Sequence, residues 1–137
     1  MTAVPAAKRA LVGAVKGRLP EALVRPRLPT KVPSERERMY VAGTENRQRT
    51  QRSGAQVESF DLRLIVEVYR TGAESGGEAE NRMWAIFGEI EAIVADDPEL
   101  GGVVWAAEVT DSAEETFPSA NGWLSRGTGR LHVEAYS

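Results

Sequence analysis

Three segments of the chain alternate between apolar and polar residues with a period of two, which predicts strands with one buried face. They cover residues 60–69, 103–110 and 130–136. Such alternation is typical of an antiparallel sheet that is covered on one side. The side chains expected in the core are those of Phe60, Leu62, Leu64, Val66, Val68, Val103, Trp105, Ala107, Val109, Leu131, Val133 and Ala135.

A long amphipathic helix is predicted between the first and the second of these strands. Apolar residues recur there at steps of three and four, which places them along one side of a helix. Residues 71–77 and 96–102 are rich in glycine and acidic residues and interrupt both periodicities, so they bound the helix. The stripe expected to pack on the sheet consists of Ala79, Met83, Ile86, Phe87, Ile90, Ile93 and Val94.

The first 56 residues divide into three parts. Residues 5–19 have apolar positions at helical spacing, with a proline in the first turn, and predict a short helix. Four prolines between positions 20 and 33 exclude a continuous helix from the next part, which is expected to be an extended strap. Residues 36–54 are rich in arginine around one apolar patch, and we expect a short strand or hairpin arm that ends in a mobile loop.

These patterns predict a single α+β domain over residues 1–137. It is expected to comprise an N-terminal helix (1–19), a Pro/Arg-rich strap and basic arm (20–56), and a strand–helix–strand–strand core (57–137). The predicted architecture is a roughly four-stranded antiparallel sheet with both helices packed on one face and the basic arm extended from it. The hydrophilic stretch 111–121 is expected to be a long acidic loop or a projecting hairpin.

The formal net charge of −3 conceals a polarised distribution of charge. Residues 1–52 contain 12 Lys/Arg against 4 Asp/Glu, whereas residues 53–137 contain 5 against 16. A chain with a basic and an acidic portion can attract copies of itself head to tail, and such contacts close into rings when the rotation allows. Alternatively, the basic portion neutralises the acidic sheet within one monomer.

The chemistry-bearing residues indicate neither catalysis nor cofactor binding. Without cysteine, a disulfide framework or a thiolate metal site is excluded. His132, the only histidine, is expected at the surface or in an interface, and no nucleophile elbow is present. The acidic residues at 96–99 lack the spacing of a calcium loop and are interpreted as a helix stop. The segment 127–129 (Gly-Thr-Gly) is too short for a phosphate loop, and we expect it to bend the last strand or to let a neighbour approach.

No apolar window approaches the length of a signal peptide core or of a membrane span. We therefore expect a soluble protein that is made in the cytoplasm and has no membrane partner.

Residues 57–137 resemble a known family. The segments that carry the resemblance are Leu64–Arg70 (LIVEVYR), Arg82–Ile86 (RMWAI), Asp97–Gly102 (DPELGG) and Gly122–Leu124 (GWL), followed by a final strand. In this order they resemble tail terminator (tail completion) proteins of long-tailed actinobacterial phages. The resemblance implies a small α+β virion protein, assembled in the host cytoplasm, that forms a six-membered ring at the neck end of the tail.

The resemblance also implies the partners. They are further copies of the chain, the tail tube protein and the head connector or neck protein, while genomic DNA passes through the lumen without specific binding. Such a role needs no active site. Two alternatives stay open: another head–tail joining ring of the virion, and a small α+β ligand-binding or enzyme domain.

The candidate interface residues are arginines of the arm, acids of the 111–121 stretch and two tryptophans. If the arm is extended, Arg47, Arg49 and Gln51 share one face and could follow a phosphate backbone, with Tyr40 available for stacking. The sequence pI near 5.3 argues against a dedicated nucleic-acid binder, and ion pairing with protein carboxylates is favoured, with a solvated loop as the other reading. Trp123 is expected either as a lid over the sheet or as an interface anchor. The candidate set is Arg36, Arg38, Arg47, Arg49, Arg52, Trp84, Glu114, Glu115 and Trp123.

Overall fold

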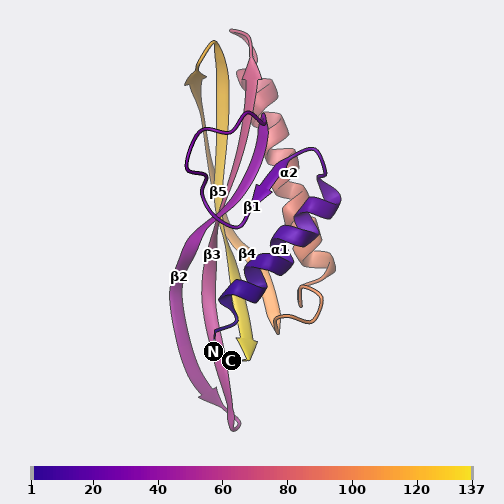
Figure 1. Cartoon of the computed structure of the whole chain (residues 1–137), viewed down its shortest axis with the longest axis vertical. Coiled ribbons are helices and arrows are strands. Elements are labelled where there is room, and N and C mark those ends of the chain that lie inside the picture. Colours follow the sequence, from indigo (N-terminus) through magenta and orange to yellow (C-terminus); the bar gives the residue numbers. More distant parts are fainter. Residues whose placement is uncertain (1, 137) are drawn as a thin grey trace.

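The computed structural model describes residues 2–136, which form two helices and one five-stranded sheet (Figure 1). The strands follow the order β1-β2-β3-β5-β4, and all neighbours are antiparallel except β1, which lies parallel to β2. The α+β class is confirmed, but the sheet has one strand more than predicted and is mixed. The elements are α1 (Val4–Arg18), β1 (Leu23–Arg25), β2 (Glu37–Arg52), β3 (Ala55–Thr71), α2 (Gly76–Asp96), β4 (Ala106–Ser119) and β5 (Gly122–Tyr136).

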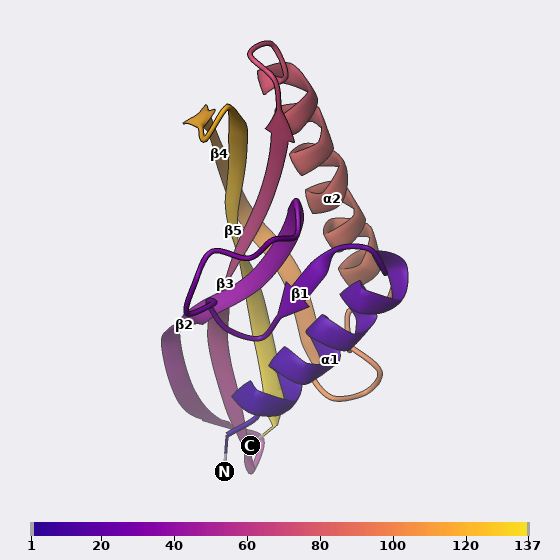
Figure 2. The same cartoon turned by 45° about the horizontal axis from the view of Figure 1, so that its top comes forward.

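Both helices pack on the same face of the sheet, as predicted (Figure 2). All seven residues of the predicted α2 stripe are buried, and so are the alternate residues of β3 and β5 that were expected to meet them. We call this side of the sheet the helix face and the other side the open face. The periods of α2, β3 and β5 therefore identified the buried side of each correctly.

The arginine-rich arm is a full strand of the sheet. β2 is paired with β3 from Glu37↔Val68 to Arg52↔Ala55, and its first half contributes Met39 and Val41 to the core. The expected mobile loop is wrong, because Ser53 and Gly54 close a two-residue turn in which both have positive φ (50° and 80°). Such turns match the twist of the two strands that they join.

Trp105 is not in the core, so that prediction is wrong. The turn after α2 extends to residue 105, with Val104 N–H donating to the Glu99 carbonyl, and β4 begins at Ala106. Val104 is buried in place of Val103, while Trp105 is 47% exposed and stacks on Tyr136. The stretch 111–121 forms the end of a projecting β4–β5 hairpin, which confirms one of the two expected alternatives.

Two glycines of β5 allow α2 to lie close against the sheet. A Cβ atom at Gly127 would collide with the Met83 sulfur, and one at Gly129 would collide with the Phe87 ring. The expectation that this Gly-Thr-Gly segment admits a close neighbour is thus confirmed, and the neighbour is α2.

The substitution Gly129→Ala is expected to lower the free energy of unfolding by about 1–3 kcal/mol, because the added methyl group has no space between Phe87 and the Asp111 carbonyl. Chemical denaturation measures this loss. The matched control is Gly13→Ala on the exposed side of α1, where a Cβ atom meets nothing within 4 Å. That change should instead stabilise the protein by about 0.5–1 kcal/mol, and equal losses at both glycines would contradict the close approach.

Candidate interaction surfaces

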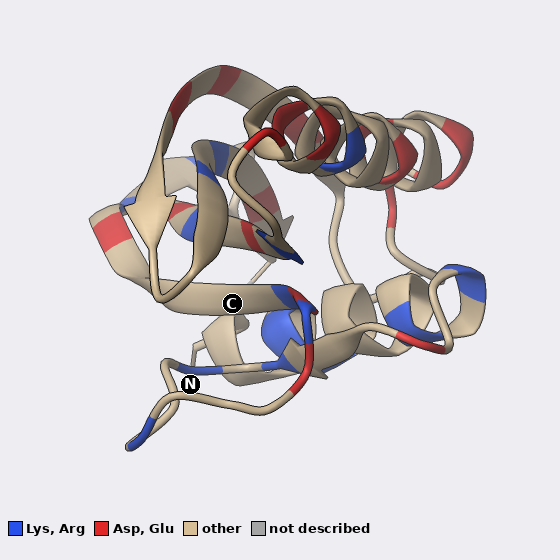
Figure 3. Cartoon of the chain, turned by 90° about the horizontal axis from the view of Figure 1, so that it is seen from above, with Lys and Arg blue, Asp and Glu red and all other residues tan. Residues whose placement is uncertain are grey.

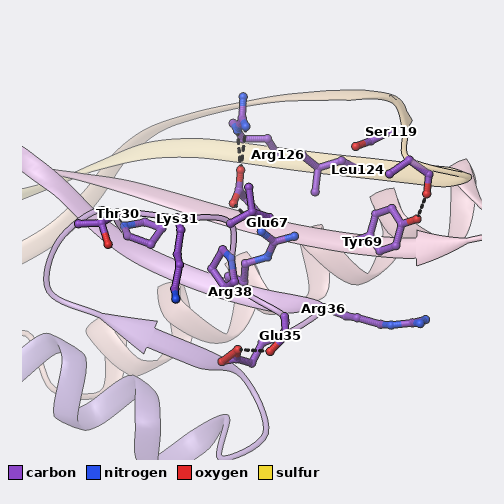
Figure 4. A pocket seen from close by; sticks show the side chains of 15 residues that line it. Thr30, Lys31, Glu35, Arg36, Arg38, Glu67, Tyr69, Ser119, Leu124 and Arg126 are labelled. Atoms are coloured by element: carbon purple, nitrogen blue, oxygen red, sulfur yellow. Dashed lines mark hydrogen bonds and ion pairs between the residues drawn. The ribbon is translucent and has the colours of Figure 1, made fainter.

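A strap of eleven residues, 26–36, connects β1 to the parallel strand β2 and crosses the open face of the sheet. Between this strap and the end of the β4–β5 hairpin lies a pocket of about 690 Å³ (Figure 4). The strap lines it with residues 29–36, and the sheet lines it with Arg38, Glu67, Tyr69, Leu124 and Arg126. The predicted extended strap therefore forms one wall of a pocket.

A buried ion triad lies at the base of this pocket. Glu67 is 8% exposed, accepts a hydrogen bond of 2.9 Å from Arg126 Nε, and forms an ion pair with Arg126 in which Nη2 is 2.8 Å from the same carboxylate oxygen. Arg38, also 8% exposed, lies 3.7 Å from the other carboxylate oxygen of Glu67. The Arg38 Nε has no hydrogen-bond partner among the described residues and is itself buried. Arg38 therefore lines the pocket with a guanidinium group of which one donor is unsatisfied among the described residues.

Arg47 takes part in an internal contact at the opposite end of the sheet. A bulge in β2 between Glu45 and Gln48, with Asn46 at a φ of 54°, accompanies a contact in which Arg47 Nε donates to Glu58. The Glu58 side chain is fully buried and also accepts hydrogen bonds of 2.7 Å from Ala3 N–H and the Thr2 hydroxyl. Arg47 thereby helps to tie the start of α1 to β3, a role that the predicted interface function did not include.

The other candidate residues are distributed over three separate places. Arg49 and Arg52 are exposed on the outer half of β2, and Trp84 is 38% exposed on α2. Glu114 accepts a hydrogen bond from Thr116 on the β4–β5 hairpin, where Glu115 is exposed. The nine candidates therefore do not form one surface.

Trp123 is folded back onto the protein. Its Nε1 donates to the Ala73 carbonyl at 2.9 Å, and its ring packs over Gly76 at the start of α2. Of the two expected alternatives, the lid agrees with the structure, although the lid covers the beginning of a helix.

The sequence analysis missed Glu58 and Glu67, the two buried acids. Glu58 extends the alternate positions of Phe60 and Leu62 on the helix face, and Glu67 interrupts the apolar run between Val66 and Val68. A carboxylate within such a pattern is a signal for a buried ion pair, because an unpaired buried charge is costly.

The pKa of Glu58 is lowered from its ordinary value of 4.5. Burial acts in the opposite direction and raises it, but hydrogen bonds from Ala3, Thr2 and Arg47 outweigh burial. Because the folded-state pKa is the lower one, ionised Glu58 stabilises the fold above pH 4.5, and this stability is lost as the pH falls through the folded-state value.

The variant Glu58→Gln tests this linkage. Between about pH 6 and pH 3, the denaturation midpoint of the wild type is expected to fall more steeply than that of the variant, because the amide has no proton to take up. Parallel curves for the two proteins would show that Glu58 does not titrate differently in the folded and unfolded states.

Among residues 2–136, no group of three or more His, Cys, Asp or Glu side chains is placed to hold a metal ion. His132 lies on the open face, where its Nδ1 is 2.8 Å from a carboxylate oxygen of Asp61. Within the same range, neither helix has the length and apolar character that a membrane crossing demands.

Comparison with known proteins finds a similar fold in a solved structure but no match in sequence. No protein-family model matches the sequence, and no curated protein matches it. A solved structure described as "Virion of native gene transfer agent (GTA) particle" contains a chain of the same fold, with a TM-score of 0.53. The match covers 95% of this chain and 94% of that chain at 8% sequence identity. At this identity the likeness shows a shared fold, which extends over essentially the whole of both chains.

Proposed function

We propose that this protein is a structural component of a phage-type virion, and that it acts as a tail terminator. The observation that carries the proposal is the likeness in fold, over 95% of the chain, to a protein of a gene transfer agent particle. The sequence resemblance of residues 57–137 to tail terminators points in the same direction. The role is one of assembly, without catalysis: copies form a six-membered ring that caps the tail tube and then docks to the head connector.

The distribution of charge supports self-assembly. Acidic residues band α2, whereas basic residues band α1 and the strap (Figure 3). The open face contains alternating charges that pair within the chain, including Arg130 with Glu45 and Asp111. Charge neutralisation within the monomer therefore satisfies part of the sheet and part of α2. It leaves Lys31 and Arg36 of the strap and Glu80 and Glu91 of α2 without a charged partner within residues 2–136.

Electron microscopy of particles made without this protein tests the proposal. If the protein is a tail terminator, its absence is expected to give overlong, headless tubes beside DNA-filled, tailless heads. Tails of normal length that fail to attach would instead make the protein a head–tail joining ring. Normal particles would contradict both virion roles.

A further inference from the structure

We propose that the strap and its pocket bind the outer side of α2 of a second copy of this chain. This inference rests on the proposed ring function and names the two surfaces that would form the ring contact. The strap side consists of Lys31, Val32, Arg36 and the pocket residue Arg38. The α2 side consists of Glu80, Trp84 and Glu91.

The strap side has basic groups without an internal acceptor. Within residues 2–136, no hydrogen bond or ion pair involves the side chains of Lys31 or Arg36, and both are exposed at the pocket (Figure 4). Below them, Arg38 also lines the pocket, and its Nη1 lies 3.7 Å from Glu67. A carboxylate that enters the pocket is therefore attracted by the cationic groups of Lys31, Arg36 and Arg38, and pairing with a guanidinium is charge-assisted.

The strap side also exposes apolar surface. Val32, between the two basic residues, is 86% exposed, and Leu28 is 50% exposed. Two such side chains on one short segment are suited to contact with an apolar or aromatic side chain of a partner. The flanking cations favour a partner that has acidic residues beside that side chain.

The outer side of α2 provides the complementary groups. Glu80, Trp84 and Glu91 are four and seven residues apart and therefore lie along one stripe of the helix, which borders the buried stripe on one side. Trp84 is 38% exposed, and neither glutamate has a hydrogen bond or ion pair within residues 2–136. The stripe on α2, in which two acids flank an aromatic residue, is thus complementary to the strap, in which two basic residues flank an apolar one.

The dimensions agree as well. Glu91 lies eleven positions after Glu80 in the helix, which corresponds to about 16 Å along the axis. Arg36 lies five positions after Lys31, and this segment can span at most about 18 Å when extended. The two carboxylates can therefore reach both ends of the basic segment.

The two surfaces lie on opposite sides of the molecule, as Figure 3 shows for α2 and the strap. A contact between unlike surfaces of identical chains is heterologous, and it generates a ring when the rotation between neighbours closes. A pair of chains joined by this contact would still have one free strap and one free α2 surface. Each free surface can bind a further copy, so the assembly grows until the ring closes.

Charge reversal tests the contact. Purified full-length Lys31→Glu/Arg36→Glu and Glu80→Lys/Glu91→Lys proteins are each expected to associate at least about tenfold more weakly than the wild type in light scattering after gel filtration. An equimolar mixture of the two variants would pair each altered strap with an altered helix, and association should return. Circular dichroism and thermal melting confirm folding, which these exposed positions should not disturb.

Matched reversals elsewhere provide the control. Arg9→Glu/Lys16→Glu on α1 and Glu108→Lys/Glu115→Lys on β4 change the net charge by the same amounts at exposed positions outside both surfaces. They are expected to leave association unchanged. If they weaken it as much as the strap and helix variants do, net charge explains the result and the contact is refuted.

Cross-linking tests the pairing directly, because the chain contains no cysteine. A mixture of Val32→Cys and Gly88→Cys proteins is expected to form an intermolecular disulfide under mild oxidation, whereas neither variant alone should; Gly88 is exposed between Trp84 and Glu91, with space for a side chain. Self-linking by Gly88→Cys alone would indicate a symmetric helix–helix contact and would overturn the proposal.

The ring function and the contact can fail separately. If the wild type assembles and both charge-reversal variants assemble equally well, this contact is refuted. The tail terminator function is then tested separately, by electron microscopy of particles made without the protein. A wild type that remains monomeric at all accessible concentrations refutes the contact as a self-association site.

Discussion

The variant Glu58→Ala is expected to lower the free energy of unfolding by about 3 kcal/mol. The Glu58 side chain is fully buried and joins β3 to two other segments: the Ala3 amide and Thr2 hydroxyl before α1, and Arg47 on β2. Removing it leaves these donors without their acceptor and leaves a cavity under α1. We place the loss at the lower end for a buried pair because Arg47 is 43% exposed and regains water.

The comparison variant for this prediction is Glu89→Ala. Glu89 pairs with Arg18 at 3.0 Å, but both side chains are about half exposed, at 45% and 49%. Such a surface pair contributes at most about 1 kcal/mol. Urea denaturation of both variants at neutral pH measures the difference, and similar small losses would show that Glu58 does not anchor α1.

The largest loss is expected for Phe87→Ala, at about 3–5 kcal/mol. Phe87 is 0% exposed in the middle of α2, and its ring fills the space that Gly129 leaves on β5. Because a glycine there has no side chain to move inward, the cavity can collapse little, and the full cost of the lost contacts remains. Denaturation with a linear extrapolation measures this value.

Trp84→Ala is the matched change on the same helix. Its ring is larger, but it is 38% exposed and makes an edge contact with Phe87 at a centroid distance of 6.0 Å. We expect a loss of about 1 kcal/mol from this aromatic pair. If Trp84→Ala lowered the free energy of unfolding as much as Phe87→Ala, position 84 would be as buried as position 87, which contradicts the structure.

The buried stripe of α2 could be predicted because it depends on spacing alone. A helix that must cover a sheet needs apolar residues every three or four positions, and the seven residues from Ala79 to Val94 fulfil this requirement. The alternate residues of β3 and of β5 followed from period two for the same reason. These patterns are local in sequence, and the same residues are buried in the folded protein.

The errors arose where local patterns were ambiguous. The alternation at 103–110 is consistent with Trp105 inside, but the turn from Leu100 to Gly102, with three positive φ angles, shifts the start of β4 to Ala106. In the arm, the polar second half of β2 suggested a mobile loop. Pairing with β3 through a Ser-Gly turn orders it instead, since backbone hydrogen bonds in a strand do not require apolar side chains.

The sequence by itself determined the α+β class, the buried faces of α2, β3 and β5, and the separation of charge along the chain. Only the tertiary structure decided which charges meet: Arg47 with Glu58, and both Arg126 and Arg38 with Glu67 beside a pocket. Periodicity reports which side of an element is buried, whereas an ion pair depends on the register and bulges of strands that are distant in sequence. Register is set by packing of the whole sheet, which no local window contains.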